Sequence, residues 1–187
     1  MKLFPSTARS ETGSISVYHE DPAGWLKIRQ ALNDLITARN QRGRDIVVVC
    51  IGTDRSTGDC LGPLVGTRLK TLGTRKAAVV GTLDHPVHAV NMEERLQEIM
   101  DRHHNPFIIA VDACLGRTER VGYINVNHGA IKPGTALGKS LPPVGDIHLS
   151  GIVNVGGFLE HLVLQNTRLS LVYEMADVIA RGISYSC

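Results

Sequence analysis

The sequence predicts an α/β fold, a three-layer α/β/α sandwich around a mainly parallel sheet. Apolar runs within residues 45–51, 77–83 and 107–111 are typical of strands that a parallel sheet buries on both faces. The segments between these runs place apolar residues at three- and four-residue steps, which indicates amphipathic helices. Strands that alternate with helices in this way favour a parallel sheet with helices packed on both faces.

Size and composition favour one domain. The chain has 187 residues, 43% of them hydrophobic, which is enough for a substantial core. We expect residues 21–187 to form a single α/β domain and residues 1–20 to form an N-terminal arm or an edge element. Apolar runs shorter than the roughly 20 residues of a membrane span, and an N-terminus without the apolar core of a secretory signal, predict a cytoplasmic protein without membrane contacts.

Charge gives little support for nucleic-acid binding. The formal net charge is +2, only 4% of the residues are aromatic, and Lys and Arg are scattered rather than gathered in a basic block. The four cysteines, at positions 50, 60, 114 and 187, form no C-x-x-C pair. A disulfide framework is therefore not expected in a chain of this size and class.

In the first half of the chain, helices and strands are expected to alternate. The expected order is a helix at 21–43, a strand at 45–51, a helix from 58 or 59 to about 73, a strand at 77–83, a helix from about 87 and a strand at 107–111. Pro22 suits the first turn of the first helix, and Gly43 suits its end. The apolar side chains expected to face inward from the third helix are Val90, Leu96, Ile99 and Met100.

The second half is expected to begin with an edge strand, because residues 121–127 alternate between apolar and polar side chains. A Gly- and Pro-rich segment follows at 128–145, and loops of that length are usually functional or mobile. We expect a short strand at 147–155 and helices at 157–164 and 167–183. One side of the last helix is expected to carry Leu169, Val172, Met175, Ala176 and Ile179.

Two aspartates follow the two most apolar strands. Asp59 comes after the strand at 45–51 and its polar loop, and Asp112 follows the strand at 107–111. Open α/β folds place their sites at the carboxyl ends of such strands, so we expect the two carboxylates to face each other across one cleft. Each aspartate alone is as well explained by capping a helix or a turn. Together, two close carboxylates can share one proton and activate a water, or hold a divalent metal.

The loop between the first strand and Asp59 supplies candidate supporting residues. They are Gly52, Thr53, Asp54, Arg55, Ser56 and Gly58. Backbone N–H groups of this loop, or the Arg55 guanidinium, are expected to stabilise an oxyanion, and Asp54 is expected to assist the pair. The loop is not a phosphate-binding loop of the Walker type, because Asp59 stands where a Lys is needed and repels phosphate.

Other candidate residues are weaker. No pair of histidines has a recognisable zinc spacing, but His85 and His148 lie where they can reach the cleft. A metal-dependent hydrolase using Asp59, Asp112, His85 and His148 is therefore one alternative. Cys60 and Cys114 lie close to the aspartates, but the sequence shows neither the base nor the lowered pKa that a thiol nucleophile needs.

Several blocks of the sequence resemble the YyaC family of sporulation proteins and, through it, the germination protease GPR. The blocks are CIGTDRSTGDCLGPLVG, VDACLG, KPGTALGKSLPPVGDI and GIVNVGGFLEHLVLQNTRLSLV, and the resemblance covers roughly residues 45–183. GPR carries segments similar to Asp59–Pro63, to Asp112–Ala113 and to the Pro-Gly-rich Pro133–Gly138. Its two aspartates are the proposed catalytic pair, which implies Asp59 and Asp112 as the catalytic residues here. The resemblance also implies the sandwich of the hydrogenase maturation proteases.

The resemblance implies an endopeptidase of the sporulating cell or forespore. Its expected substrate is a protein or peptide, such as the small acid-soluble spore proteins that GPR degrades. No cofactor is expected from the leading hypothesis, and a divalent metal belongs to the alternative. A non-enzymatic binding or regulatory protein on the same fold is the second alternative, and the sequence is also compatible with a homo-oligomer.

Overall fold

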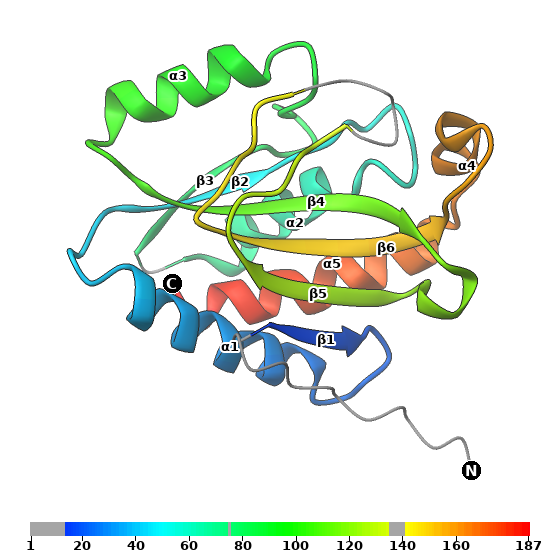
Figure 1. Ribbon diagram of the computed structural model, residues 1–187, viewed down its shortest axis with the longest axis horizontal. Helices are drawn as coiled ribbons and strands as arrows, with labels where there is room; N and C mark the ends of the chain where they lie inside the picture. The colour runs from blue at the N-terminus through cyan, green and yellow to red at the C-terminus, as the bar shows by residue number, and fades with distance from the viewer. Residues whose placement is uncertain (1–13, 75, 135–140) are drawn as a thin grey trace.

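The computed structural model describes residues 14–74, 76–134 and 141–187 (Figure 1). Its elements, in chain order, are β1 (Ile15–Tyr18), α1 (Gly24–Arg39), β2 (Ile46–Cys50), α2 (Leu61–Leu72), β3 (Ala77–Val80), α3 (Met92–Arg102), β4 (Phe107–Gly116), η1 (Thr118–Arg120), β5 (Tyr123–His128), β6 (Ile147–Val155), α4 (Glu160–Gln165) and α5 (Leu169–Ser184). Within these ranges, no helix has the length and apolar character needed to cross a membrane.

The six strands form one mixed sheet in the order β1-β5-β6-β4-β2-β3. The strands β3, β2, β4 and β6 run parallel, whereas β5 is antiparallel to β6 and β1 is antiparallel to β5. The mainly parallel sheet predicted from the sequence is therefore confirmed. β1 lies at one edge of the sheet, within the stretch expected to form an arm or an edge element, and residues 1–13 of that stretch lie outside the described residues.

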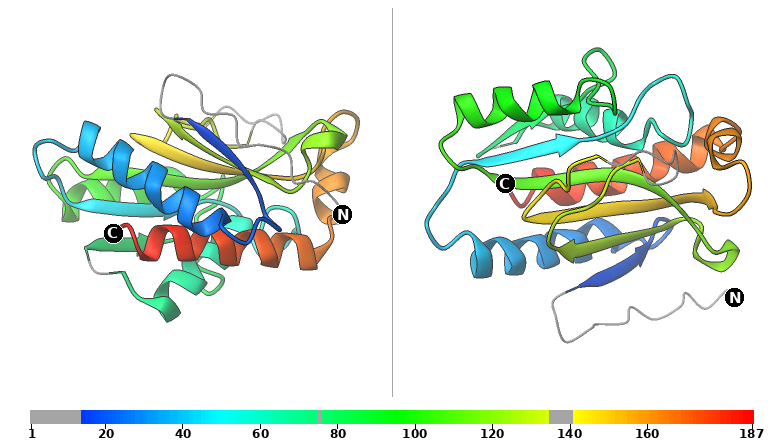
Figure 2. Two further views of the ribbon diagram at one scale, coloured as in Figure 1. Left: turned by 90° about the horizontal axis from the view of Figure 1, so that it is seen from below. Right: turned by 45° about the horizontal axis from the view of Figure 1, so that its top comes forward.

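Helices cover both faces of the sheet (Figure 2). Alternate residues of β2 enter two separate cores: Val48 joins the core under α1, α2 and α5, whereas Val47 and Val49 join the core under α3. On the α3 face, Val144 of the segment between β5 and β6 completes the cover, held by an antiparallel bridge to Ile131. The predicted three-layer α/β/α sandwich is thus confirmed, with an irregular segment taking part of one helical layer.

The third helix begins later than the sequence predicts. α3 starts at its Met92 rather than near Val87, because Val87 is buried and bridges Ile51 at the edge of the sheet. The Gly52 backbone N–H donates to the Val87 carbonyl oxygen at 2.8 Å and fixes this contact. Val90 therefore lies in the turn before the helix, 86% exposed, and Met100 is 47% exposed on the helix itself. The prediction that these two side chains face inward is wrong.

β4 is twice as long as the strand predicted at 107–111. Its pairing with β2 ends at the Cys50–Val111 pair, but its pairing with β6 continues from Ile109 to Gly116. Asp112 therefore lies inside a strand rather than at its end. β2 ends before it reaches Asp112, so the side of β4 next to Asp112 that faces β2 has no strand partner there among the described residues. That opening becomes the candidate site.

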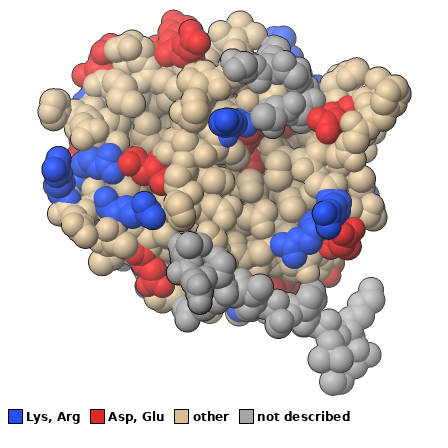
Figure 3. All heavy atoms as spheres, viewed as in Figure 1, with Lys and Arg blue, Asp and Glu red and all other residues tan. Residues whose placement is uncertain are grey.

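Two helix ends also differ from expectation. α2 begins at Leu61, after a turn, and no side chain caps its first residues, so the capping role considered for Asp59 is not adopted. Leu169 is 59% exposed rather than part of the apolar side of α5, because it is the first residue of that helix. On the face seen in Figure 3, Lys and Arg lie in small groups among Asp and Glu, without a continuous basic surface.

Candidate active site

The candidate site lies where the chain reverses its direction across the sheet. From β2, the chain passes through α2 to β3 on one side, and it then returns through α3 to β4 on the other side of β2. The carboxyl ends of β2 and β4 diverge at this point, which is where open α/β sheets form a crevice. Asp59 follows β2, and Asp112 lies on β4 one residue beyond its last pair with β2.

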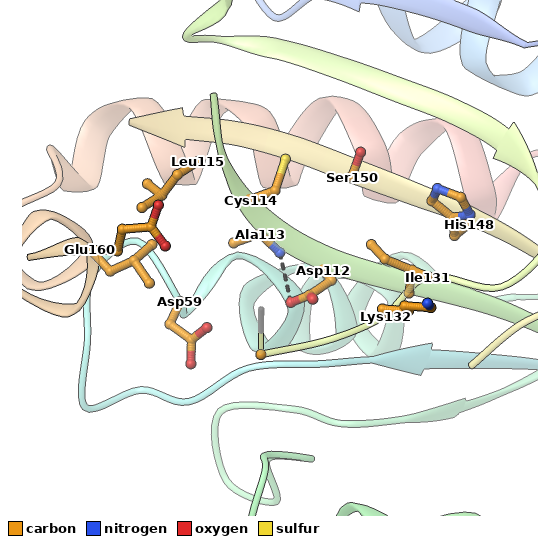
Figure 4. A pocket seen from close by; sticks show the side chains of 12 residues that line it. Asp59, Asp112, Ala113, Cys114, Leu115, Ile131, Lys132, His148, Ser150 and Glu160 are labelled. Atoms are coloured by element: carbon orange, nitrogen blue, oxygen red, sulfur yellow. Dashed lines mark hydrogen bonds between the residues drawn. The ribbon is translucent and has the colours of Figure 1, made fainter. Parts of the chain in front are cut away.

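A cavity of about 480 Å³ occupies this crevice and brings the two aspartates together. Figure 4 shows both carboxylates in it, one from the loop before α2 and one from β4. The lining residues are Asp59, Asp112, Ala113, Cys114, Leu115, Ile131, Lys132, Gly134, His148, Ser150, Glu160 and Leu164. The pair expected from the sequence therefore shares one cavity.

Asp112 is the more deeply buried of the two, with 6% of its surface exposed. Burial raises the pKa of its carboxyl group well above the ordinary value, because the charged form loses its hydration. The nearby charge of Asp59 raises this pKa further, against the opposing effect of the hydrogen bond that the Ala113 N–H donates to Asp112 Oδ1 at 2.9 Å. These surroundings favour the protonated acid form of Asp112.

Asp59 is partly buried at the rim of the same cavity. Burial raises its pKa, but a backbone hydrogen bond from Thr53 and the positive potential of His88 both oppose that increase. The pKa of Asp112 is raised further than that of Asp59, so Asp59 is the carboxyl group that ionises first as the pH rises. The pair is thus suited to hold one proton on Asp112 and a negative charge on Asp59, the division of roles that acid–base chemistry needs.

The loop between β2 and Asp59 packs tightly against its surroundings. Gly52 has a φ of 139°, and a Cβ atom at this position would lie 1.9 Å from the Asp59 carbonyl oxygen, so only glycine allows the turn. The Thr53 N–H donates to that same carbonyl oxygen at 3.2 Å, and the Gly58 N–H donates to the Leu164 carbonyl oxygen at 2.8 Å. The N–H groups of Gly52, Thr53 and Gly58 are therefore engaged within the protein.

This loop holds Asp59 in place and does not itself line the cavity. Asp54 and Arg55 are exposed and absent from the cavity wall, so the structure does not bring the Arg55 guanidinium or the Asp54 carboxylate to the pair. The Ser56 hydroxyl is buried without a hydrogen-bond partner among the described residues. The expected oxyanion donors are thus not arranged around the two carboxylates, and among the described residues Lys132 is the lysine or arginine that lines the cavity.

The two histidines considered as metal ligands are not brought together. His148 lines the cavity, and its Nδ1 donates to the Gly129 carbonyl oxygen at 2.8 Å. His85 is exposed and lines a different cavity, along β3. Within residues 14–74, 76–134 and 141–187, no three His, Cys, Asp or Glu side chains are placed to hold a metal ion. The alternative ligand set of Asp59, Asp112, His85 and His148 is therefore not assembled.

The thiols near the aspartates are not activated. Burial raises the pKa of Cys114 to about 11, although the Ser150 hydroxyl opposes the shift. Burial likewise raises the pKa of Cys60 to about 11, and its thiol donates to the Thr57 carbonyl oxygen. Both side chains are therefore neutral thiols at physiological pH, which is unsuited to nucleophilic catalysis.

Three residues of the site were not singled out by their sequence pattern. His88 acts on Asp59 from the loop after β3, while Lys132 and Glu160 line the cavity from the β5–β6 connection and from α4. The position of His88 beyond a strand adjacent to β2 is a signal that points to the same edge of the sheet. Lys132 precedes Pro133–Gly138, the segment matched to GPR, of which residues 135–138 lie outside the described residues.

Comparisons with known proteins place the chain in a family. Residues 16–182 match the family described as "Protein of unknown function (DUF1256)". The chain is 54% identical over 168 residues to "Uncharacterized protein YyaC" of Bacillus subtilis (strain 168), a match that covers 90% of this chain and 81% of the relative.

Among solved structures, the NiFe hydrogenase maturation protease HycI from Thermococcus kodakarensis KOD1 is similar with a TM-score of 0.42 and 19% identity. That match covers 79% of this chain and 97% of HycI. The family assignment depends on the sequence, which matches the family over nearly the whole described domain. The chain belongs to the YyaC family, described as "Protein of unknown function (DUF1256)".

Proposed function

We propose that this protein is an endopeptidase that hydrolyses peptide bonds with Asp59 as the general base and Asp112 as the general acid. One observation carries the proposal: two carboxyl groups from separate elements line one cavity, and their surroundings shift the pKa of Asp112 further than that of Asp59. Two titratable groups whose environments separate their pKa values in this way are the usual basis for assigning an acid and a base.

In the proposed reaction, a water molecule lies between the two carboxyl groups. The Asp59 carboxylate takes a proton from this water as its oxygen attacks the peptide carbonyl carbon, and the protonated Asp112 donates a hydrogen bond to the carbonyl oxygen. A C–O bond forms and the C–N bond then breaks. The departing nitrogen takes the proton that Asp59 removed from the water. The pair holds one proton at the start and two after the attack, so it ends the cycle with one proton, on Asp112.

The surface beside the cavity supports a protein or peptide substrate. Phe158 is 87% exposed, Leu159 is 50% exposed and Leu162 is 41% exposed, around a second cavity of about 530 Å³. The helix α4 separates the two cavities, because its Glu160 lines the one with the aspartates and its Leu162 lines the other. Exposed apolar side chains that gather in this way are typical of surfaces that bind other polypeptides.

The cellular setting is also part of the proposal. The resemblance to GPR supports action in the sporulating cell or forespore, on small acid-soluble spore proteins. A polypeptide that is unfolded when free in solution can enter an open crevice in an extended form, which suits a cavity placed at the edge of the sheet.

The test is cleavage of a purified small acid-soluble spore protein by the wild type and by the variants Asp59→Asn and Asp112→Asn. Each variant removes one proton-transfer group, so we expect the cleavage rate to fall by at least about 10²-fold. Asp54→Asn is the matched control, because Asp54 is an exposed acid of the same loop outside the cavity wall. A chelator is expected to leave the rate unchanged.

Other outcomes reject the proposal in distinct ways. Full activity in both cavity variants removes the role of the aspartates, and loss of activity with the chelator indicates a metal-dependent hydrolase. If the clean wild type does not cleave the spore protein or other extended polypeptides, the observed fold serves a binding or regulatory role instead.

A further inference from the structure

The strand β3 ends the sheet on the side opposite β1, and in the described part of the chain it pairs only with β2. A groove of about 250 Å³ runs beside it, lined by the five consecutive residues 78–82. Because successive side chains of a strand point to opposite faces, a groove that touches every residue in turn follows the backbone edge of the strand. The groove therefore exposes the outer backbone groups of β3.

Helices from the two faces of the sheet wall this groove. Lys70 reaches it from α2, which packs on one face, and Arg95 and Arg102 reach it from α3, which packs on the other. The result is a slot with a strand edge at its base and a helix on either side. Its shape fits one additional extended chain, the geometry by which peptides add to the edge of a sheet.

The walls of the slot are positively charged. Among the described residues that line it, Lys70, Arg95 and Arg102 are cations and Glu98 is the one carboxylate. Glu98 is paired with Arg95 at 2.9 Å, whereas Lys70 and Arg102 are exposed and in no ion pair within the described residues. His85 and His103 also line the slot. A chain that binds here meets an excess of positive charge, shared between Lys70 on the α2 side and Arg102 on the α3 side.

We propose that the β3 edge binds an extended acidic peptide segment, which adds to the sheet as a further strand. Acidic side chains at every second position of that segment face α3, where Arg102 lies, unpaired among the described residues, and backbone hydrogen bonds to β3 fix its register. This interaction does not depend on the proposed proteolysis, because the slot and the cavity with Asp59 and Asp112 share no lining residue in the part of the chain that the structure describes.

The test uses the full chain carrying Asp59→Asn, so that the probe is not cleaved, and a fluorescent peptide of about eight residues that alternates Glu with Thr or Val. Fluorescence anisotropy is expected to show binding that weakens as salt screens the charges. Hydrogen exchange is expected to slow at residues 77–80 when the peptide is bound. The same peptide with alternate backbone amides N-methylated is expected to bind at least about tenfold more weakly, because it cannot pair with the strand edge.

Charge variants test the walls of the slot. Arg102→Glu is expected to weaken binding by about tenfold, because it turns an attraction into a repulsion, and Lys70→Glu is expected to weaken it by less, because Lys70 lies on the α2 side of the slot. Arg39→Glu is the matched control, since Arg39 is an exposed cation on α1, away from β3, and it is expected to have little effect. Equal binding of the N-methylated peptide, an equal effect of Arg39→Glu, unchanged exchange at 77–80, or no binding at low salt would each overturn the proposal.

Discussion

At Asp112, the needs of the proposed chemistry and those of stability oppose each other. In the unfolded chain this carboxyl group ionises near pH 3.9, whereas in the folded protein burial and the charge of Asp59 raise its pKa well above that value. Between those two values the unfolded state binds fewer protons than the folded state, so the free energy of unfolding decreases as the pH rises. Above the folded pKa the loss is complete and constant.

We therefore expect Asp112→Asn to increase the free energy of unfolding at neutral pH. The expected gain is at least about 1 kcal/mol, because the buried ionisable group is removed, and the Asn side-chain oxygen can still accept the hydrogen bond from the Ala113 N–H. Urea unfolding measured from pH 3 to pH 8 checks this: the gain should be smallest below about pH 3.9 and grow as the pH rises. A variant less stable than the wild type at neutral pH contradicts the argument.

Single residues also show how far the site could be predicted. Asp59 and Asp112 were predicted to share a cleft because each follows an apolar strand, and that inference needs only the strand order at the edge of a parallel sheet. His88 and Glu160 escaped prediction because they come from a loop and from a six-residue helix, whose positions depend on packing. The direction in which the loop N–H groups point depends on packing as well.

At the scale of elements, the close approach of α2 to β2 and β3 fixes where the β2–α2 loop can lie. A Cβ atom on Gly66 would lie 1.8 Å from the Gly81 carbonyl oxygen, and one on Gly62 would lie 2.0 Å from the Ile51 carbonyl oxygen. Both obstacles are backbone atoms, which cannot swing aside as a side chain can. The glycines therefore allow α2 to pack directly against the ends of the strands. Because Asp59 precedes α2 in the chain, this packing also fixes the position of Asp59.

We expect Gly66→Ala to destabilise the protein by about 1–3 kcal/mol or more, because it forces the helix away from the strand. The sign of this change in stability is informative, because replacing Gly by Ala at an exposed helix position stabilises a protein by about 1 kcal/mol through helix propensity. The midpoint of urea unfolding measures the effect. Lys70→Ala on the exposed face of α2 is the control and is expected to stay within about 0.5 kcal/mol of the wild type. A stabilised Gly66→Ala variant would show that α2 has room to move.

Elements with strong patterns were predicted well, and those shaped by contacts were not. The buried strands and α5 carry long apolar signals that local sequence is enough to detect. The start of α3 was misplaced because Val87 looks like the first apolar residue of a helix but bridges Ile51 in the sheet. The extension of β4 past Val111 was missed because only β6, far along the chain, supplies the partner for those residues.

At the scale of the whole molecule, the sheet divides into a parallel part that carries the cavity and an antiparallel edge that closes the core. β1 and β5 form that edge, on the far side of β6 from β4 and its aspartate. The described residues that line the cavity come from β4, β6, the β2–α2 and β5–β6 connections and α4, and none of them belongs to β1. Stability contributed by β1 and activity in the cavity should therefore respond to different mutations.

His19 offers a way to test this separation. Its ring is buried after β1, with Nδ1 3.2 Å from the Gly122 carbonyl oxygen and Nε2 3.3 Å from Glu174 Oε2 on α5, so it joins the sheet edge to a helix. His19→Ala removes the buried ring and its contact with Glu174, whereas the Gly122 carbonyl oxygen keeps the backbone N–H of residue 19 at 3.0 Å. We expect the free energy of unfolding to fall by about 1–3 kcal/mol. Glu174→Gln is expected to have a smaller effect, because that carboxylate is largely exposed.

The informative comparison is between stability and turnover in the same variant. Hydrogen exchange should become faster in β1 and β5 of His19→Ala, because local opening of an edge needs less free energy than global unfolding. Peptide cleavage by the folded variant should equal that of the wild type, since the cavity wall and both aspartates are unchanged. If cleavage falls as far as stability does, the sheet transmits the change across β6 to β4, and the two halves act as a single cooperative unit rather than as a supporting edge and a separate site.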